Sequence, residues 1–313
     1  MAETICITGA AGNLGRLTVD YLQGQTDFRQ HLMIHRRPWA QPLDDRRQRV
    51  YRCDLADPAS MADCLAGVDQ IVHFAGVLFR PRPERFLPVT NLHYFQNLVQ
   101  AAQLAGVGRL ILISFPHVEG PTDPDHPATE RLNRVPSSVH ATTRLAEERH
   151  LLATWPDSIV LRVGMVYGRG VLMPDAARWL AQRRLLGVWR EPTSIHLISI
   201  VDFLRTVTAA LQAPAAKGIY NVGDEGRQTL QEYLDFACDH WGCSRPWRMP
   251  LWMIYAAATM CETWGRLCRC RSPLTQDFID IGRVPYYGDT RRCRAELLPR
   301  LRYPTMHEGA STF

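Results

Sequence analysis

The sequence predicts an α/β protein with a doubly wound parallel sheet and a smaller, mixed C-terminal lobe. Three observations lead to this prediction. Strand and helix patterns alternate through the first half of the chain, and a glycine-rich turn follows the first expected strand. The run Gly108–Ser114 is almost wholly apolar, as expected for a strand whose two faces are both covered by helices.

Short apolar runs indicate strands in the first half of the chain, and apolar residues at helical spacing indicate helices. Asp57 is a candidate helix cap, and Pro58 stands in the first turn after it. In chain order, the expected elements are strand Thr4–Thr8, helix Asn13–Leu22, strand His31–His35, helix Asp57–Ala66, strand Gln70–Phe74, helix Asn91–Ala105 and strand Gly108–Ser114.

Residues 120–138 interrupt this alternation, because four prolines and many polar residues predict a loop. The pattern then resumes and loosens toward the C-terminus. The expected elements are helix Ala141–Ala153, strand Ser158–Val163, helix Asp175–Leu186, strand Ile195–Ile200, helix Val201–Ala213, strand Lys217–Val222 and helix Thr229–Trp241.

The segment Pro250–Cys270 is apolar and aromatic, and arginines follow it. Its best apolar run, Leu251–Cys261, is shorter than the roughly 18 residues that a membrane span needs. A helix that covers a substrate pocket or the core is the favoured interpretation. A helix that lies on a membrane surface is the alternative.

Composition excludes several classes of protein. With 46% hydrophobic and 21% charged residues among 313, the chain is typical of globular proteins rather than disordered ones. Its net charge of +5 is too balanced to indicate nucleic acid as a partner. We expect no signal peptide and no metal site, and nine scattered cysteines favour a reducing, cytoplasmic location.

The turn Thr8–Gly15, with the sequence TGAAGNLG, lies between the first strand and the first helix. Glycines at this spacing allow a sharp turn, close approach of a pyrophosphate and close packing of helix on strand, while the helix N-terminus offers free amides to phosphates. The turn therefore predicts a dinucleotide-binding, Rossmann-type fold. Its expected cofactor contacts are Gly9, Ala11, Gly12, Asn13, Leu14 and Gly15.

The end of the second strand bears on the choice of cofactor. A site for NAD usually has an acidic residue there, whereas this chain has His35, Arg36 and Arg37. Arginines pair well with a 2′-phosphate, so NADP is favoured over NAD. We expect residues 1–170 to form the dinucleotide-binding domain and residues 171–313 to form mainly a substrate lobe, with strands from about 195–225 returning to the sheet.

Further motifs accompany the glycine turn. They are Cys53-Asp54-Leu55, Val72–Gly76, Asn91, and Leu161–Val163 followed by Val166–Gly168. Together they resemble the extended short-chain dehydrogenase/reductases, which include NAD-dependent epimerases and dehydratases. The tail Ala295–Thr312 is similar to the branch of 3β-hydroxysteroid dehydrogenases and dihydroflavonol reductases. The resemblance implies cofactor contacts at Asp54, Leu55, Ala75, Gly76 and Asn91.

The same resemblance implies catalysis by a serine, a tyrosine and a lysine, the last two one helical turn apart. Here His140 stands in place of the tyrosine and Arg144 in place of the lysine. The serine falls on Ser114, or on Phe115 in an alternative alignment that leaves no member of the triad in place.

An imidazole can exchange protons near neutral pH, and a neighbouring Arg144 would favour its neutral form, which would make His140 a better base than acid. We therefore predict Ser114, His140 and Arg144 as catalytic residues and His117 and Tyr167 as substrate contacts. The alternative is that His140 and Arg144 only pack, after catalysis was lost.

The favoured function is an NADP-dependent oxidoreductase that acts on a small, largely apolar or aromatic carbonyl or hydroxyl compound. Two alternatives stay open: a non-redox isomerase, lyase or cyclase, and a non-catalytic NADP-binding accessory protein. By analogy with the resembled family, a homodimer would form through helices Asn91–Ala105 and Ala141–Ala153.

Overall fold

Seven parallel strands form the central sheet of the computed structural model, which describes residues 2–76, 81–136, 138–268, 270, 272 and 274–313. Their order is β11-β6-β5-β4-β1-β2-β3, so the predicted doubly wound sheet is confirmed. The strands are β1 (Thr4–Thr8), β2 (Arg29–Ile34), β3 (Gln48–Arg52), β4 (Gln70–His73), β5 (Arg109–Ser114), β6 (Ile159–Val163) and β11 (Gly218–Val222).

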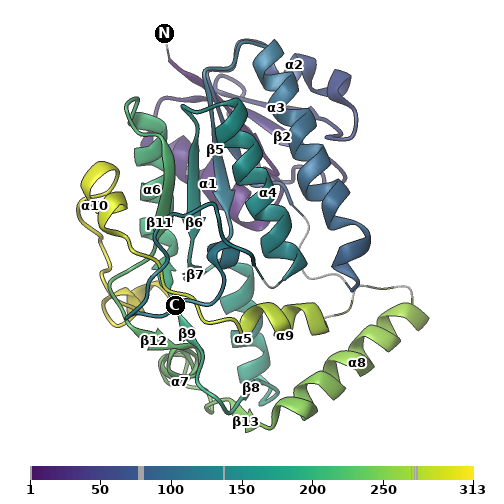
Figure 1. Ribbon diagram of the computed structural model, residues 1–313, viewed down its shortest axis with the longest axis vertical. Coiled ribbons are helices and arrows are strands. Elements are labelled where there is room, and N and C mark those ends of the chain that lie inside the picture. The colour runs from purple at the N-terminus through teal and green to yellow at the C-terminus, as the bar shows by residue number, and fades with distance from the viewer. Residues whose placement is uncertain (1, 77–80, 137, 269, 271, 273) are drawn as a thin grey trace.

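Helices cover both faces of this sheet (Figure 1). Successive side chains of a strand point to opposite faces, so Ile5 and Ile7 join one core cluster and Cys6 joins the other. The first cluster includes residues of α1 (Asn13–Gln25) and α6 (Ile200–Gln212). The second includes residues of α2 (Ala62–Leu65), α3 (Tyr94–Leu104) and α4 (Val139–Thr154).

Three local differences separate the structure from the sequence-based expectations. Strand β3 was not expected, because its sequence QRVYR is largely polar and lies at the sheet edge. The helix expected at Asp57–Ala66 divides into a 3-10 turn, Pro58–Met61, and α2, with the Asp57 carboxylate accepting from the amide of Ala59 at 3.1 Å. A π-helical turn, Pro88–His93, precedes α3.

The C-terminal part adds a third core cluster and three two-stranded sheets. The expected strand Ile195–Ile200 is wrong as one element, because it divides into β9 and β10, which pair with different strands. The helices are α5 (Leu172–Gln182), α7 (Leu230–His240), α8 (Leu251–Leu267), α9 (Gln276–Gly282) and α10 (Arg291–Glu296). The pairs are β7 (Met165–Tyr167) with β10 (Leu197–Ser199), β9 (Ser194–Ile195) with β12 (Gln228–Thr229), and β8 (Gly187–Trp189) with β13 (Trp247–Met249).

Among the described residues, no helix has both the length and the apolar character needed to cross a membrane. Helices α8 and α9 pack against each other and lie away from the central sheet (Figure 1). Three short 3-10 helices complete the described elements: Pro83–Arg85, Pro116–Glu119 and Glu308–Thr312.

Candidate functional site

The glycine turn leaves no room for side chains at three of its positions. Gly9 has a φ of +67°, and a Cβ atom there would lie 3.0 Å from the amide nitrogen of Ala75. A Cβ atom at Gly12 would lie 2.9 Å from the carbonyl oxygen of Gly9. The same oxygen blocks a Cβ atom at Gly15. The turn thus brings α1 close to the ends of β1 and β4, which meet at one edge of the sheet.

The N-terminus of α1 is open to an anion. Gly12 caps the helix without a side-chain hydrogen bond, and the first amides of any helix lack partners within it. The Asn13 side chain is occupied, since its Nδ2 donates to the carbonyl oxygen of Gly170 at 2.6 Å and its Oδ1 accepts from the amide of Leu172 at 2.9 Å. Backbone amides, rather than this side chain, are therefore the groups that fit the diphosphate of a dinucleotide.

The ends of β2 and β3 lie next to this turn. His35 and Asp54 are half exposed, with 3.6 Å between Nε2 and Oδ2. Arg36 and Arg37 are exposed, and among the described residues no carboxylate lies within 4.0 Å of either guanidinium. These two cations are available to an anionic group at the ribose end of the site. Leu55 presents its carbonyl oxygen to Asn97 Nδ2 at 2.9 Å.

At the end of β4, Gly76 makes room for Arg144 of α4. A Cβ atom at Gly76 would lie 3.2 Å from Arg144 Cζ and closer still to its Nη2. The guanidinium is buried and donates to Glu147 Oε2 at 2.7 Å. Burial raises the pKa of Glu147 to about 7, although Arg144 opposes the shift. Ala75 lies beside this contact, and its amide donates to Thr8 Oγ1 at 3.4 Å.

His140 is buried one helical turn before Arg144. Its ring lies edge-on to Phe115, with 4.5 Å between ring centroids. Among the described residues, neither of its ring nitrogens has a hydrogen-bond partner. Burial lowers the pKa of His140 to about 3, and the charges of Arg144 and His117 lower it further. The imidazole is therefore neutral at physiological pH.

His117 completes an aromatic cluster around Phe115. The rings of His117 and Phe115 are 4.6 Å apart, and His117 Nε2 lies 3.0 Å from the carbonyl oxygen of Val284. Its Nδ1 has no hydrogen-bond partner among the described residues. Burial lowers the pKa of His117 to about 4. The structure thus brings His117 and His140 into contact with the same phenyl ring.

Ser114 belongs to a separate, fully bonded cluster. Its hydroxyl donates to Glu148 Oε1. Arg162 holds that carboxylate with an Nη2–Oε2 distance of 2.6 Å, and its Nη1 lies 2.5 Å from Glu119 Oε1. Glu119 in turn accepts the amides of Thr129 and Arg131, at 3.2 and 3.1 Å. The cluster therefore fixes the loop of residues 120–138 to the sheet.

Two expected contact residues lie in the interior. Asn91 is buried in the π-helical turn, with its Nδ2 3.4 Å from Thr143 Oγ1 on α4. Tyr167 is fully buried in the third core cluster, where its hydroxyl donates to the carbonyl oxygen of Thr305 at 3.3 Å and its ring stacks on Phe313 at 5.3 Å. This placement argues against a direct contact between Tyr167 and a substrate.

Sequence reasoning missed the partners of the expected residues. The three-residue spacing of Arg144 and Glu147 is a signal that could have found that ion pair. Glu119 and Arg162 are 43 residues apart, so no local pattern could have joined them. No group of three or more His, Cys, Asp or Glu side chains within the described part of the chain could hold a metal ion.

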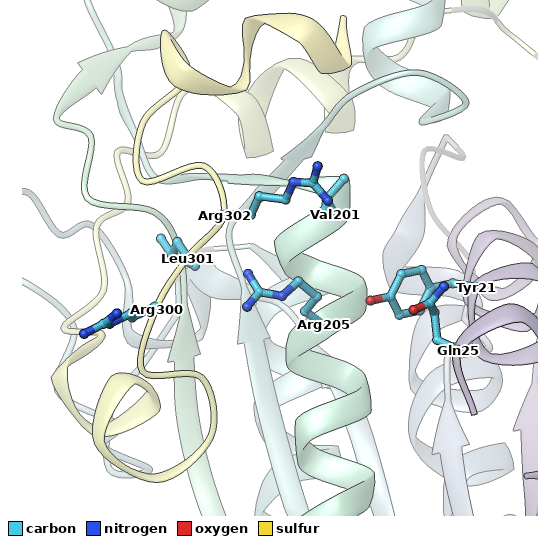
Figure 2. Close-up of a pocket in the computed structure, with 7 residues that line it drawn as sticks. All are labelled: Tyr21, Gln25, Val201, Arg205, Arg300, Leu301 and Arg302. Atoms are coloured by element: carbon cyan, nitrogen blue, oxygen red, sulfur yellow. The ribbon is translucent and has the colours of Figure 1, made fainter. Parts of the chain in front are cut away.

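A separate hollow of about 490 Å³ lies away from these residues (Figure 2). It is bordered by the C-terminal part of α1, by α6 and by the segment after α10, whereas the glycine turn is at the other end of α1. Arg205 there pairs with the buried Asp202 at 2.6 Å. The lining residues are Tyr21, Gln25, Val201, Arg205, Arg300, Leu301 and Arg302.

A family model described as the NAD dependent epimerase/dehydratase family matches residues 5–223. The matched range contains the glycine turn, all seven strands of the central sheet and the His140–Arg144 turn of α4. The chain belongs to the NAD dependent epimerase/dehydratase family.

Curated relatives of this epimerase/dehydratase chain include dehydrogenases and reductases. It is 31% identical to a uronate dehydrogenase of Pseudomonas putida over 140 residues, which are 45% of this chain and 51% of that protein. The match thus spans about half of that relative. A 2-alkyl-3-oxoalkanoate reductase of Stenotrophomonas maltophilia is 24% identical over 315 residues, and the match covers 93% of each chain.

Solved structures confirm the fold of this family member. MoeE5 in complex with UDP-glucuronic acid and NAD is 20% identical, with a TM-score of 0.76 and coverage of 99% of this chain and 97% of that one. RMD from Pseudomonas aeruginosa, complexed with NADPH, is 20% identical, with a TM-score of 0.72 and the same coverage of both chains. These two neighbours are complexed with NAD in one case and with NADPH in the other.

Proposed function

We propose that the protein is an NADP-dependent reductase of an apolar carbonyl compound, in which His140 and Arg144 replace the family's tyrosine and lysine. The observation that carries the proposal is the state of His140. It is a buried, neutral imidazole whose two nitrogens have no partner in the described part of the chain, and it lies one helical turn from a buried guanidinium. A buried polar group without a partner is costly unless something binds it, so the ring is well suited to a ligand.

The dinucleotide would be held by the backbone of Gly12, Asn13 and Leu14, beside the ends of β1 and β4. When bound, a nicotinamide supplies the hydride for such a reduction. The protein residues have a different task, which is to stabilise the charge that develops on the carbonyl oxygen. A neutral His140 can donate an N–H hydrogen bond to that oxygen, and the nearby Arg144 favours negative charge at the same place.

Arg144 is expected to favour the neutral form of His140, and burial acts in the same direction. Burial is the largest cause of the lowered pKa of about 3. A base with so low a pKa is weak, so the proposed direction is carbonyl reduction rather than alcohol oxidation. This choice replaces the expectation that His140 is mainly a base.

Similarity to the 2-alkyl-3-oxoalkanoate reductase supports the substrate class. That match covers 93% of both chains and so includes the C-terminal lobe. Its named substrate carries alkyl groups beside a ketone, which agrees with an apolar carbonyl compound. The matches to uronate dehydrogenases cover between 42% and 70% of this chain, so a polar sugar acid has less support.

The preference for NADP rests on Arg36 and Arg37, which are exposed at the end of β2. Arg36→Asp is expected to weaken NADPH binding by roughly tenfold to a hundredfold, because one charge-assisted contact is lost. NADH binding should change little. Calorimetry with both cofactors measures this difference, and Arg49→Asp, an exposed change on the neighbouring β3, controls for net charge. Equal weakening of both cofactors contradicts the assignment.

The catalytic proposal is tested by deuteride transfer from labelled NADPH to a series of 2-alkyl-3-oxo esters. We expect His140→Phe to keep NADPH binding but to lower turnover by about a hundredfold or more, because the donor is lost. His140→Tyr restores the family's residue and should recover part of the rate. His126→Phe, a change at an exposed histidine of the loop, is the matched control.

Between about pH 5 and pH 8, any change in wild-type turnover is expected to come from Glu147, whose pKa is about 7, because an imidazole with a pKa of about 3 does not titrate there. Binding of NADPH without deuteride transfer to any ester would refute the reductase proposal.

One observation favours a second candidate, a dinucleotide-binding protein without redox activity. The Phe115 ring covers one side of His140, and Ser114 is bonded to Glu148 rather than free. If Phe115 holds the serine position, no hydroxyl of the triad remains. Unchanged and negligible turnover in both wild type and His140→Tyr would support this candidate. The homodimer expected from the resemblance stays a prediction.

A further inference from the structure

Helix α8 buries only one of its faces. Ile254, Ala258 and Gly265 are buried. On the same side, the backbone amide of Gln276 in α9 donates to Glu262 Oε1 at 2.9 Å. The Gln276 side chain also donates to Thr259 Oγ1 at 2.9 Å. Packing against α9, β8 and the third core cluster therefore accounts for the buried face and leaves the opposite face exposed.

Large apolar side chains occupy the exposed face of α8. Their exposed fractions are high: Trp252 71%, Met253 38%, Met260 72%, Trp264 65% and Leu267 75%. At about 100° of rotation per residue, these five side chains fall within about 120° of the helix circumference. They form a stripe about 25 Å long, given a rise of about 1.5 Å per residue over 17 residues. We call these five residues the α8 stripe.

Exposure of such a stripe to water is unfavourable. Contiguous exposed apolar surface of this kind usually marks a site of interaction. Its composition is also specific. Tryptophans stand near both ends, and indole rings prefer the boundary between headgroups and acyl chains. Thr263 falls within the arc of the stripe, and Thr259 and Arg266 lie along its edge on the helix circumference. The helix therefore has the pattern of a segment that lies in the plane of a membrane surface.

Charge distinguishes a lipid surface from a second copy of the chain. The acidic residue of α8, Glu262, is buried and holds the amide of Gln276. Arg266 is exposed near the C-terminal end, and the sequence adds Arg269 and Arg271 with no acidic residue from Thr263 to Gln276. The α8 stripe carries no carboxylate. The stripe of a second copy, in either orientation, would therefore bring no carboxylate to the arginines of the first copy. Anionic headgroups supply that complement.

We propose that the α8 stripe docks the protein on an anionic lipid bilayer, with the helix parallel to the surface and Arg266 among the headgroups. This inference does not rest on the proposed reductase activity. It selects the membrane-surface alternative for residues 250–270, and it requires no membrane-spanning segment.

Flotation of the full chain with vesicles tests the proposal. Vesicles of phosphatidylcholine with phosphatidylglycerol are compared with vesicles of phosphatidylcholine alone. We expect wild type to bind the anionic vesicles and to lose most binding at high salt. The double variant Trp252→Ser with Trp264→Ser should reduce the bound fraction by roughly tenfold or more, because two interfacial side chains are lost.

Two controls keep the test specific. Leu104→Ser on α3 removes an apolar side chain that is 83% exposed, outside the α8 stripe, and should leave binding unchanged. Arg266→Gln should weaken binding to the anionic vesicles with only a small change in melting temperature, since its 3.5 Å pair with Glu262 is partly exposed, and it replaces the tryptophan variants if those fail to fold. Sedimentation equilibrium in solution reports self-association of each variant.

Three outcomes would overturn the proposal. In the first, wild type binds neither kind of vesicle. In the second, the stripe variants bind as well as wild type. In the third, wild type forms a dimer that the tryptophan variants dissociate while no vesicle is bound, which assigns the stripe to a second copy of the chain.

Discussion

Two clusters of buried ionisable groups, both built partly on α4, differ in how completely they are bonded. In the Arg162 cluster, the guanidinium contacts two carboxylates, and Ser114 supplies a further hydrogen bond to Glu148. In the His140 cluster, both ring nitrogens of His140, Nδ1 of His117 and Oε1 of Glu147 lack partners among the described residues.

This difference separates a structural role from a functional one. A buried ion pair with all partners in place holds its surroundings in one arrangement, and removing one member is costly. A cluster with unpartnered polar atoms gains its missing hydrogen bonds only when something binds. The Arg162 cluster is therefore expected to support folding, and the His140 cluster to meet a ligand.

The largest expected effect is on the Arg162 cluster. Arg162→Met leaves Glu119 and Glu148 buried without their cation and is expected to lower the free energy of unfolding by about 3–5 kcal/mol. Arg245→Met, which removes an exposed pair with Asp239, should cost less than about 1 kcal/mol. Urea denaturation measures both. A similar, small loss in the two variants would show that the buried cluster has no special structural role.

Ser114 is predicted as a catalytic residue, but it lies in the Arg162 cluster. A variant at this position therefore tests whether that cluster has a catalytic role as well as a structural one. Ser114→Ala removes a hydrogen bond to a carboxylate and is expected to cost about 1.5–3 kcal/mol of stability. If the cluster is only structural, turnover per folded molecule stays near that of wild type. Thermal denaturation and kinetics on the same samples separate the effects, and lost turnover at unchanged stability would place Ser114 in catalysis.

The smallest expected effect is a change in how stability depends on pH. Folded His140 has a pKa of about 3, lowered by burial from an ordinary value of 6.5. Between these values the unfolded chain binds the extra proton, so stability falls as pH falls below about 6.5. One such group contributes a slope of at most about 1.4 kcal/mol per pH unit.

His140→Phe should remove this contribution and flatten the dependence of stability on pH between about 4 and 6.5. At neutral pH its stability should stay close to that of wild type, because no hydrogen bond of the ring is lost. Urea denaturation as a function of pH measures the slope, with the exposed His126→Phe as the control. An unchanged slope would mean that the imidazole is charged in the folded protein.

Glu147 acts in the opposite direction. Its folded pKa of about 7 lies above the ordinary value of 4.5, since burial favours the neutral acid. Stability therefore falls as pH rises from about 4.5 to 7, and this part of the profile should disappear in Glu147→Gln.

The sequence alone determined much of the sheet. Its parallel strands are buried on both faces, so they appear as apolar runs such as Gly108–Ser114, and the glycines of the turn are required by backbone contacts. Edge strand β3 escaped prediction because an edge needs no apolar face, and its residues Gln48–Arg52 are mostly polar.

The sequence also identified which residue types replace the family's tyrosine and lysine, because a four-residue spacing on one helix is a local property. Only the tertiary structure decided their states. Burial makes His140 neutral, Gly76 leaves space for the guanidinium of Arg144, and Arg162 joins Glu119 to Glu148 across the fold. Desolvation and hydrogen bonding depend on groups distant in the chain, so these states could not be predicted from neighbouring residues in the sequence.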